Sequence, residues 1–294
     1  MSDRLSAGAP DALEFRGWGG LRLQGDAWGK PQNRPVLFLH GGGQTRHSWG
    51  KTATVLAEQG WYAVSLDLRG HGDSDWDDAR DYRIEAFVED VAGIIREIGP
   101  PAVLVGASLG GITSLLLTGE FYPELSAGLV LVDVTPRLEK TGVERILNFM
   151  RGGHEGFDSY EEAAEAIASY NPHRDYKKDI TGLERVLRRK DDGRLYWHWD
   201  PDVIHEDFIF QEADYGRFRD AAKNVKVPTL LVRGKETDVV SVAGAHEFLE
   251  YVPHAEFVDV TGAGHMVAGD RNDAFSEAVV NFLQKFPPPD TARS

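Results

Sequence analysis

The chain has 294 residues, 41% of them hydrophobic and 27% charged, and a formal net charge of −15 at pH 7. Its length and composition favour a globular protein with one large core and an insertion, and the negative charge disfavours nucleic acid and anionic membranes as partners. The absence of cysteine excludes disulfides, thiolate metal sites and a cysteine nucleophile. No cofactor or metal is expected, and no signal-like segment opens the chain, so a cytoplasmic location is expected.

The chain should begin with strands and then alternate strands with helices. Residues 13–29 carry two period-two stretches separated by Gly19 and Gly20, which indicates an antiparallel hairpin. Six continuous apolar runs are typical of buried strands and cover residues 36–40, 62–68, 102–107, 128–134, 229–234 and 255–260. Segments of helical period, such as 84–98, separate most of them. This pattern predicts an α/β fold with a mostly parallel, doubly wound sheet.

The alternation is interrupted between residues 136 and 227. We find no strand-like run there, only helical patterns and the aromatic segment "LYWHWDP". We therefore predict a core domain of residues 1–135 and 228–294 and a helical cap of residues 136–227, placed over the sheet edge where such folds bind ligands. The cap residues expected nearest a substrate are Phe149, Met150, Tyr170, Trp197 and Trp199.

Residues 101–119 are uncharged over about the length of a membrane span, but their glycines and change of period favour a strand, a turn and a helix. In "VGASLGG" the turn falls on Ser108, with Gly106 and Gly110 two residues away on either side. Such a turn holds a serine hydroxyl at the amino end of a helix, as a nucleophile needs. The alternative is a glycine-rich helix start with a capping serine.

A nucleophilic serine requires a base and an acid that orients this base. Of the ten histidines, His265 alone follows the last predicted strand, and we predict it as the base. Asp238, in the loop after the penultimate strand, fits the chain order serine, acid, histidine and is the predicted acid. Asp133, at the end of the strand after the nucleophile helix, and Glu236 remain alternatives.

The same chemistry requires donors for an oxyanion. The backbone N–H of Leu109 should be one, and the glycine loop after residues 36–40 should supply the other through Gly42. We expect His40 to support this loop. The three glycines alternatively form a simple flexible turn, whereas phosphate binding is disfavoured because no Gly-Lys-Ser/Thr follows.

Taken in order, the following motifs resemble the α/β-hydrolase superfamily: "LHGGGQTRHSW", "DLRGHGDSDW", "VGASLGG", "VRGKETDVVS" and "GAGHMVAGD". The resemblance implies an α/β-hydrolase fold with Ser108, Asp238 and His265 as triad and Gly42 and Leu109 as oxyanion donors. It is greatest for the branch of esterases, cofactor-free haloperoxidases and carbon-carbon bond hydrolases. Relatives that hydrolyse epoxides or haloalkanes carry aspartate at the position of Ser108. Glycines at 42 and 43, in place of bulkier residues, imply a roomier acyl side.

The expected activity is hydrolysis of a small or medium uncharged carboxylic ester through an acyl-enzyme on Ser108, with the ester and water as partners. A carbon-carbon bond hydrolase or a perhydrolase would use the same triad. A ligand receptor that keeps the triad without turnover is a third possibility. The sequence leaves the oligomeric state open.

Overall fold

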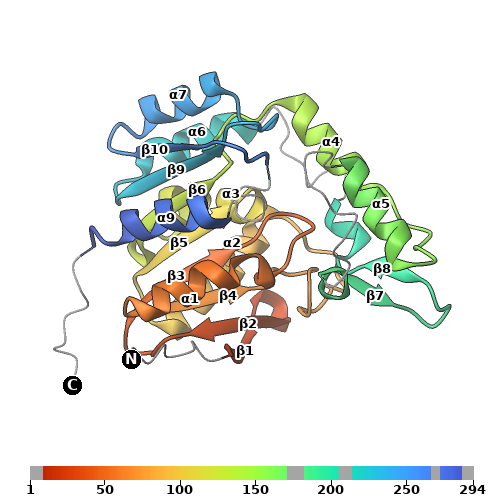
Figure 1. The fold of residues 1–294 in the computed structure, drawn as a ribbon. Helices are drawn as coiled ribbons and strands as arrows, with labels where there is room; N and C mark the ends of the chain where they lie inside the picture. The colour runs from red at the N-terminus through yellow and green to blue at the C-terminus, as the bar shows by residue number, and fades with distance from the viewer. Residues whose placement is uncertain (1–8, 171–181, 205–213, 266–271, 287–294) are drawn as a thin grey trace, which may run out of the picture.

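The computed structural model describes residues 9–170, 182–204, 214–265 and 272–286 (Figure 1). An eight-stranded sheet runs through the molecule in the order β1-β2-β4-β3-β5-β6-β9-β10. Its strands are β1 (Asp11–Arg16), β2 (Arg22–Trp28), β3 (Arg34–Leu39), β4 (Trp61–Leu66), β5 (Ala102–Ala107), β6 (Ser126–Val132), β9 (Thr229–Gly234) and β10 (Glu256–Val260). β1 and β2 form the expected antiparallel pair, β2 is antiparallel to β4, and the remaining neighbours are parallel. The predicted fold class is thereby confirmed.

Helices cover both faces of the sheet. They are α1 (Gly50–Glu58), α2 (Ile84–Ile98), α3 (Leu109–Leu116), α6 (Asp214–Asn224), α7 (Val242–Tyr251) and α9 (Asn272–Leu283). The pleat of β3 sends Val36 and Phe38 to the face packed by α1 and α9, and Leu37 and Leu39 to the face packed by the other four helices. Burial on both faces explains why these strands are continuous apolar runs rather than alternating ones.

Residues 101–119 do not form a single helix. They contain β5, a sharp turn at Ser108 and α3, as the sequence predicted. Among the residues that the structure describes, no helix is long and apolar enough to cross a membrane.

The insertion after β6 lies to one side of the sheet in Figure 1 and has its own hydrophobic cluster. It contains α4 (Lys140–Arg151) and α5 (Tyr160–Tyr170), but also an antiparallel hairpin of β7 (Leu187–Arg189) and β8 (Leu195–Trp197). The prediction that this segment holds helices alone is therefore wrong. Each strand is only three residues long, too short to show a period in the sequence.

α6 lies within the segment predicted as cap but packs on the core. Its buried residues Phe218, Ala221 and Ala222 share a hydrophobic cluster with α3. A Cβ placed on Gly119, just after α3, would lie 2.1 Å from the carbonyl oxygen of Ala221, so the two backbones touch. We use the name "cap" below for residues 136–204.

Candidate active site

Ser108 lies at the turn between β5 and α3 with φ 46° and ψ −113°, a backbone conformation that side-chain-bearing residues rarely adopt. Strain of this kind costs on the order of 1–3 kcal/mol and persists only where the surroundings impose it. The turn places Ser108 at the N-terminus of α3, where backbone N–H groups have no acceptor within the helix. The N–H of Leu109, the first residue of α3, belongs to that set.

Two glycines let the backbone turn this sharply because other backbone atoms lie where a Cβ would be. A Cβ on Gly106 would lie 2.3 Å from the carbonyl oxygen of Gly110, and one on Gly110 would lie 2.4 Å from the carbonyl oxygen of Leu39. Both distances are far below van der Waals contact. Strand, turn and helix are therefore packed backbone against backbone around Ser108.

We expect Gly110→Ala to destabilise the fold by about 3 kcal/mol or more, because the clashing atom is a main-chain oxygen and overpacking typically costs about 1–3 kcal/mol. Gly93→Ala is the matched control. Gly93 also lies within a helix, α2, but a Cβ there meets nothing within 4 Å, so alanine should stabilise by about 0.5–1 kcal/mol. Urea unfolding measures both free energies, and equal effects would contradict the packing described for the turn.

His265 lies in the loop after β10, and its Nδ1 is 2.7 Å from Oδ2 of Asp133. Asp133 is fully buried and follows β6 directly, whereas Ser108 follows the neighbouring parallel strand β5. Both residues therefore lie at the same edge of the sheet. The structure thus joins the predicted base to one of the alternative acids.

The carboxylate of Asp133 accepts two further hydrogen bonds. The N–H of Gly234 donates to Oδ1 at 3.1 Å, and the hydroxyl of Thr237 donates to Oδ2 at 2.6 Å. An ionised carboxylate only accepts, so Nδ1 of His265 carries the proton of the shared hydrogen bond. Nε2 is then the ring nitrogen left to accept a proton, as a general base requires.

The prediction that Asp238 is the acid beside His265 is contradicted. Oδ1 of Asp238 accepts a hydrogen bond of 2.8 Å from Arg145 on α4, and its side chain is 40% exposed. Glu236 accepts from the N–H of Gly262. Chain order alone did not separate the candidates, because Asp133, Glu236 and Asp238 all lie between Ser108 and His265.

The glycine loop after β3 lies against the turn that carries Ser108. A Cβ on Gly41 would lie 3.2 Å from Cβ of Ser108, and the N–H of Gly110 donates to the carbonyl of His40. The N–H of Gln44 donates to the carbonyl of Gly41 at 3.1 Å, and Gly43 has φ +73°. Residues 41–44 therefore form a type II turn, which requires glycine at Gly43.

His40 fixes the first peptide group of this turn. The N–H of Leu68 donates to Nε2 of His40 at 3.0 Å, so the ring proton is on Nδ1, which donates to the carbonyl of Gly41 at 2.8 Å. In a trans peptide the N–H points away from the carbonyl. Holding the carbonyl of Gly41 thus sets the direction of the N–H of Gly42, and the expected support of the loop by His40 is confirmed.

The five predicted cap residues form one cluster. Phe149 stacks on Tyr170 with ring centroids 4.4 Å apart, Trp197 stacks on Trp199 at 4.9 Å, and Phe149 is 5.5 Å from Trp197. Met150, on the same helix as Phe149, is buried in the same hydrophobic cluster.

This cluster lies against the glycine loop. A Cβ on Gly42 would lie 3.4 Å from the sulfur of Met150, and one on Gly43 would lie 3.4 Å from the ring of Trp199. A Cβ at either position would be in ordinary van der Waals contact with a cap side chain, and the expectation that these glycines leave a roomier acyl side stays a prediction.

Three buried histidine rings adjoin the loop and belong to His40, His71 and His198. The ring centroids of His40 and His71 are 5.0 Å apart and those of His71 and His198 are 6.0 Å apart. Burial lowers the pKa of His40 to about 4 and that of His71 to about 3, and it holds the pKa of His198 well below its ordinary value. All three rings are therefore neutral at pH 7.

We expect the free energy of unfolding to fall between pH 7 and pH 5 by about 2 kcal/mol for each of His40 and His71. The unfolded chain binds protons below pH 6.5 while the buried rings stay neutral to about pH 4 and 3, so stability is lost as the pH falls. Urea unfolding at the two pH values checks this. Between pH 7 and pH 5 the free energy of unfolding of His71→Phe should fall by about 2 kcal/mol less than that of the parent. The same pH dependence in both proteins would contradict this expectation.

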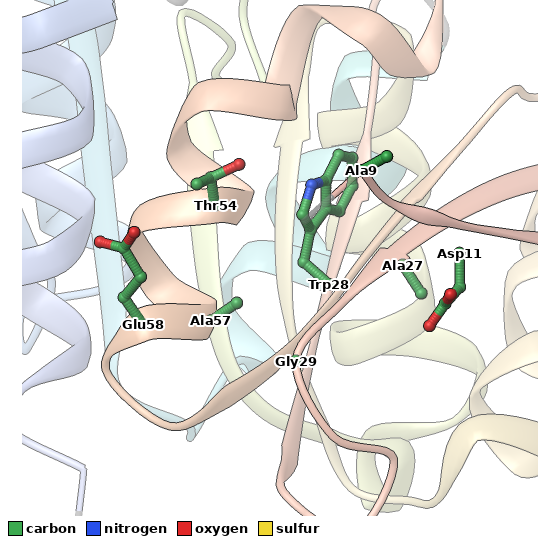
Figure 2. A pocket seen from close by; sticks show the side chains of 8 residues that line it. All are labelled: Ala9, Asp11, Ala27, Trp28, Gly29, Thr54, Ala57 and Glu58. Carbon is green, nitrogen blue, oxygen red and sulfur yellow. The ribbon is translucent and has the colours of Figure 1, made fainter. Parts of the chain in front are cut away.

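A depression away from Ser108 lies between β2, α1 and the chain before β1 (Figure 2). It encloses about 230 Å³ and is lined by Ala9, Asp11, Ala27, Trp28, Gly29, Thr54, Ala57 and Glu58. Its ionisable side chains are two carboxylates, without a basic partner among the lining residues. Neither it nor these carboxylates belong to the arrangement around Ser108.

Sequence comparisons point in the same direction as the geometry. A model of the alpha/beta hydrolase family matches residues 36–278. Esterase Rv0045c of Mycobacterium tuberculosis is 33% identical over 288 residues, which cover 96% of this chain and 88% of that protein. The sn-1-specific diacylglycerol lipase ABHD11 of Mus musculus is 27% identical, with coverage of 84% and 80%.

A comparison with solved structures also finds an alpha/beta hydrolase. The crystal structure of an alpha/beta hydrolase from Novosphingobium aromaticivorans superposes with a TM-score of 0.82 at 25% identity, covering 96% of this chain and all of that one. The similarity thus extends over nearly the whole chain.

Proposed function

Because the chain belongs to the alpha/beta hydrolase family, we propose that it is a serine esterase with Ser108 as nucleophile, His265 as base and Asp133 as the acid that orients it. The observation that carries the proposal is the 2.7 Å hydrogen bond between His265 and the buried Asp133, at the sheet edge where the strained turn presents Ser108. The relatives named above support an esterase or a related hydrolase.

In the first half of the reaction, Oγ of Ser108 bonds to the carbonyl carbon of the ester and its proton passes to Nε2 of His265. The carbonyl oxygen becomes an oxyanion that accepts from the N–H groups of Gly42 and Leu109. The carbon–oxygen bond to the alcohol then breaks, and His265 protonates the departing alcohol. Asp133 stays ionised and stabilises the imidazolium.

In the second half, water attacks the acyl-enzyme while His265 accepts its proton. The oxyanion forms again at the same donors and collapses as the bond to Ser108 breaks. His265 returns the proton to Oγ, and the carboxylic acid leaves.

The side chains of the cap favour an uncharged substrate. The cap side chains nearest to Gly42 and Gly43 include Met150 and Trp199, apolar groups suited to a hydrocarbon acyl or alcohol group. Arg145 lies over the ring of Tyr170 at 5.2 Å, and its charge is paired with Asp238. An anionic substrate therefore gains little from it.

A panel of p-nitrophenyl esters from acetate to octanoate tests the proposal. We expect many turnovers per protein molecule, a maximum at short or medium acyl length, and poor turnover of the charged hemisuccinate compared with the butyrate. Fewer than one turnover per molecule on every ester would contradict an enzyme and favour a receptor on the same scaffold.

A further inference from the structure

We propose that His198 of the cap is a positioning residue for the oxyanion hole, because its ring bridges the glycine turn and the loop of residues 69–74. This inference rests on the proposed function and goes beyond it: a cap residue would set the rate of the chemical step as well as the shape of the pocket. His198 stands between the two tryptophans of "YWHW" and is not one of the site residues predicted from the sequence.

The hydrogen bonds of His198 fix its tautomer. The N–H of Gly72 donates to Nδ1 at 2.7 Å, so the ring proton is on Nε2, which lies 3.3 Å from the carbonyl oxygen of Gly43. The side chain is only 1% exposed. A buried ring that both accepts and donates in this way joins two loops that are far apart in the sequence.

The bond to Gly43 complements the one that His40 makes to Gly41. His40 holds the first peptide group of the turn and His198 holds the last. The two residues between these peptide groups are Gly42 and Gly43, and glycine has the least restricted backbone angles of any residue. Two histidine rings therefore restrict this turn in addition to its own hydrogen bond from Gln44 to Gly41, and the N–H of Gly42 lies within it.

The other side of His198 is anchored on the core. The N–H of Asp200 donates to the carbonyl of Gly70 at 2.8 Å, and Arg188 of β7 donates to Asp73 at 2.6 Å. Asp200 also accepts from the hydroxyl of Tyr82 at 2.6 Å. The cap segment that carries His198 is thus fixed on the loop of residues 69–74, and the ring extends this anchoring to the turn.

Substitutions of His198 distinguish a role in positioning the glycine turn from a role in packing alone. His198→Phe keeps an aromatic ring but loses both hydrogen bonds, and His198→Gln restores a donor for Gly43. His71→Phe is the matched control, since His71 is equally buried in the same group of rings but its Nδ1 donates to the carbonyl of Arg69. Loss of a complete oxyanion donor costs about 100-fold to 1000-fold in kcat, so a displaced donor should cost about 10-fold to 100-fold.

We expect His198→Phe to lower kcat for p-nitrophenyl butyrate by that factor with KM within twofold of the parent. Its affinity for a butyl trifluoromethyl ketone, which forms an oxyanion on the serine, should fall by the same factor. Affinity for the corresponding secondary alcohol, which occupies the pocket without an oxyanion, should not change. His198→Gln should recover part of kcat, and His71→Phe should retain most of it.

An unchanged kcat in His198→Phe, or an equal loss of affinity for ketone and alcohol, would overturn the inference. If His198→Phe does not fold, His198→Leu, which also lacks both hydrogen bonds, is compared with His71→Leu, and equal values of kcat would overturn the inference as well. Labelling of the parent with a fluorophosphonate distinguishes a failure of the role proposed for His198 from a failure of the proposed serine esterase. A labelled Ser108 with unaffected variants refutes the role of His198 alone, whereas an unlabelled parent refutes the esterase itself.

Discussion

Ser108→Ala is expected to lower kcat for ester hydrolysis by about 10⁵-fold to 10⁶-fold, because no covalent acyl-enzyme can form without Oγ. The variant keeps the Cβ that lies against Gly41, so the turn and its packing are retained. The free energy of unfolding should therefore change by less than about 1 kcal/mol. Steady-state kinetics on p-nitrophenyl butyrate and urea unfolding measure the two quantities on the same preparation.

The size of this effect matters as much as its direction. Residual activity at a few per cent of the parent, in a preparation free of host esterase, would mean that Ser108 is not the nucleophile. A large loss of unfolding free energy would instead show that the serine hydroxyl stabilises the turn, and the kinetic result would then say nothing about catalysis.

Asp133→Asn is expected to lower kcat by about 10⁴-fold. The amide can donate to Nδ1 of His265 and so favour the tautomer in which Nε2 carries the proton and cannot accept another. The neutral amide is also a weaker hydrogen-bond acceptor than the carboxylate for the N–H of Gly234 and the hydroxyl of Thr237. Steady-state kinetics at pH 7 to 8 measures the loss.

Asp238→Asn is the control for this variant, since it makes the same chemical change in the acid that the sequence favoured. It breaks an ion pair with Arg145 whose two side chains are 47% and 40% exposed. Such pairs contribute about 0–1 kcal/mol. We expect kcat within about threefold of the parent, and a larger loss in Asp238→Asn than in Asp133→Asn would contradict the assignment of the acid.

The fold and the nucleophile turn could be predicted because short-range physics determines them. Continuous apolar runs indicate strands buried on both faces, and glycines two residues either side of Ser108 occur where backbones pack closely. The acid could not be predicted, because its identity depends on which loop carboxylate turns inward. The hydroxyl of Thr237 and the N–H of Gly234 stabilise Asp133 there, whereas Arg145 of the cap pairs with Asp238.

The cap was the least predictable part of the chain for a related reason. Its hairpin has three residues per strand, and its position depends on single contacts such as Gly72 to His198. The aromatic segment "YWHW" lies in an aromatic cluster against the glycine loop, but nothing in its composition showed that Met150 and Trp199 would contact Gly42 and Gly43. That packing is set by tertiary contacts and not by local pattern.

The most direct test of the account is the mass-spectrometric mapping of a fluorophosphonate adduct, with its rate of formation, in the parent, Asp238→Asn and Asp133→Asn. We expect one adduct, on Ser108, formed at similar rates in the parent and Asp238→Asn and about 10³-fold or more slowly in Asp133→Asn. An adduct on another residue, no adduct in the parent, or an equal rate in Asp133→Asn would contradict a triad of Ser108, His265 and Asp133.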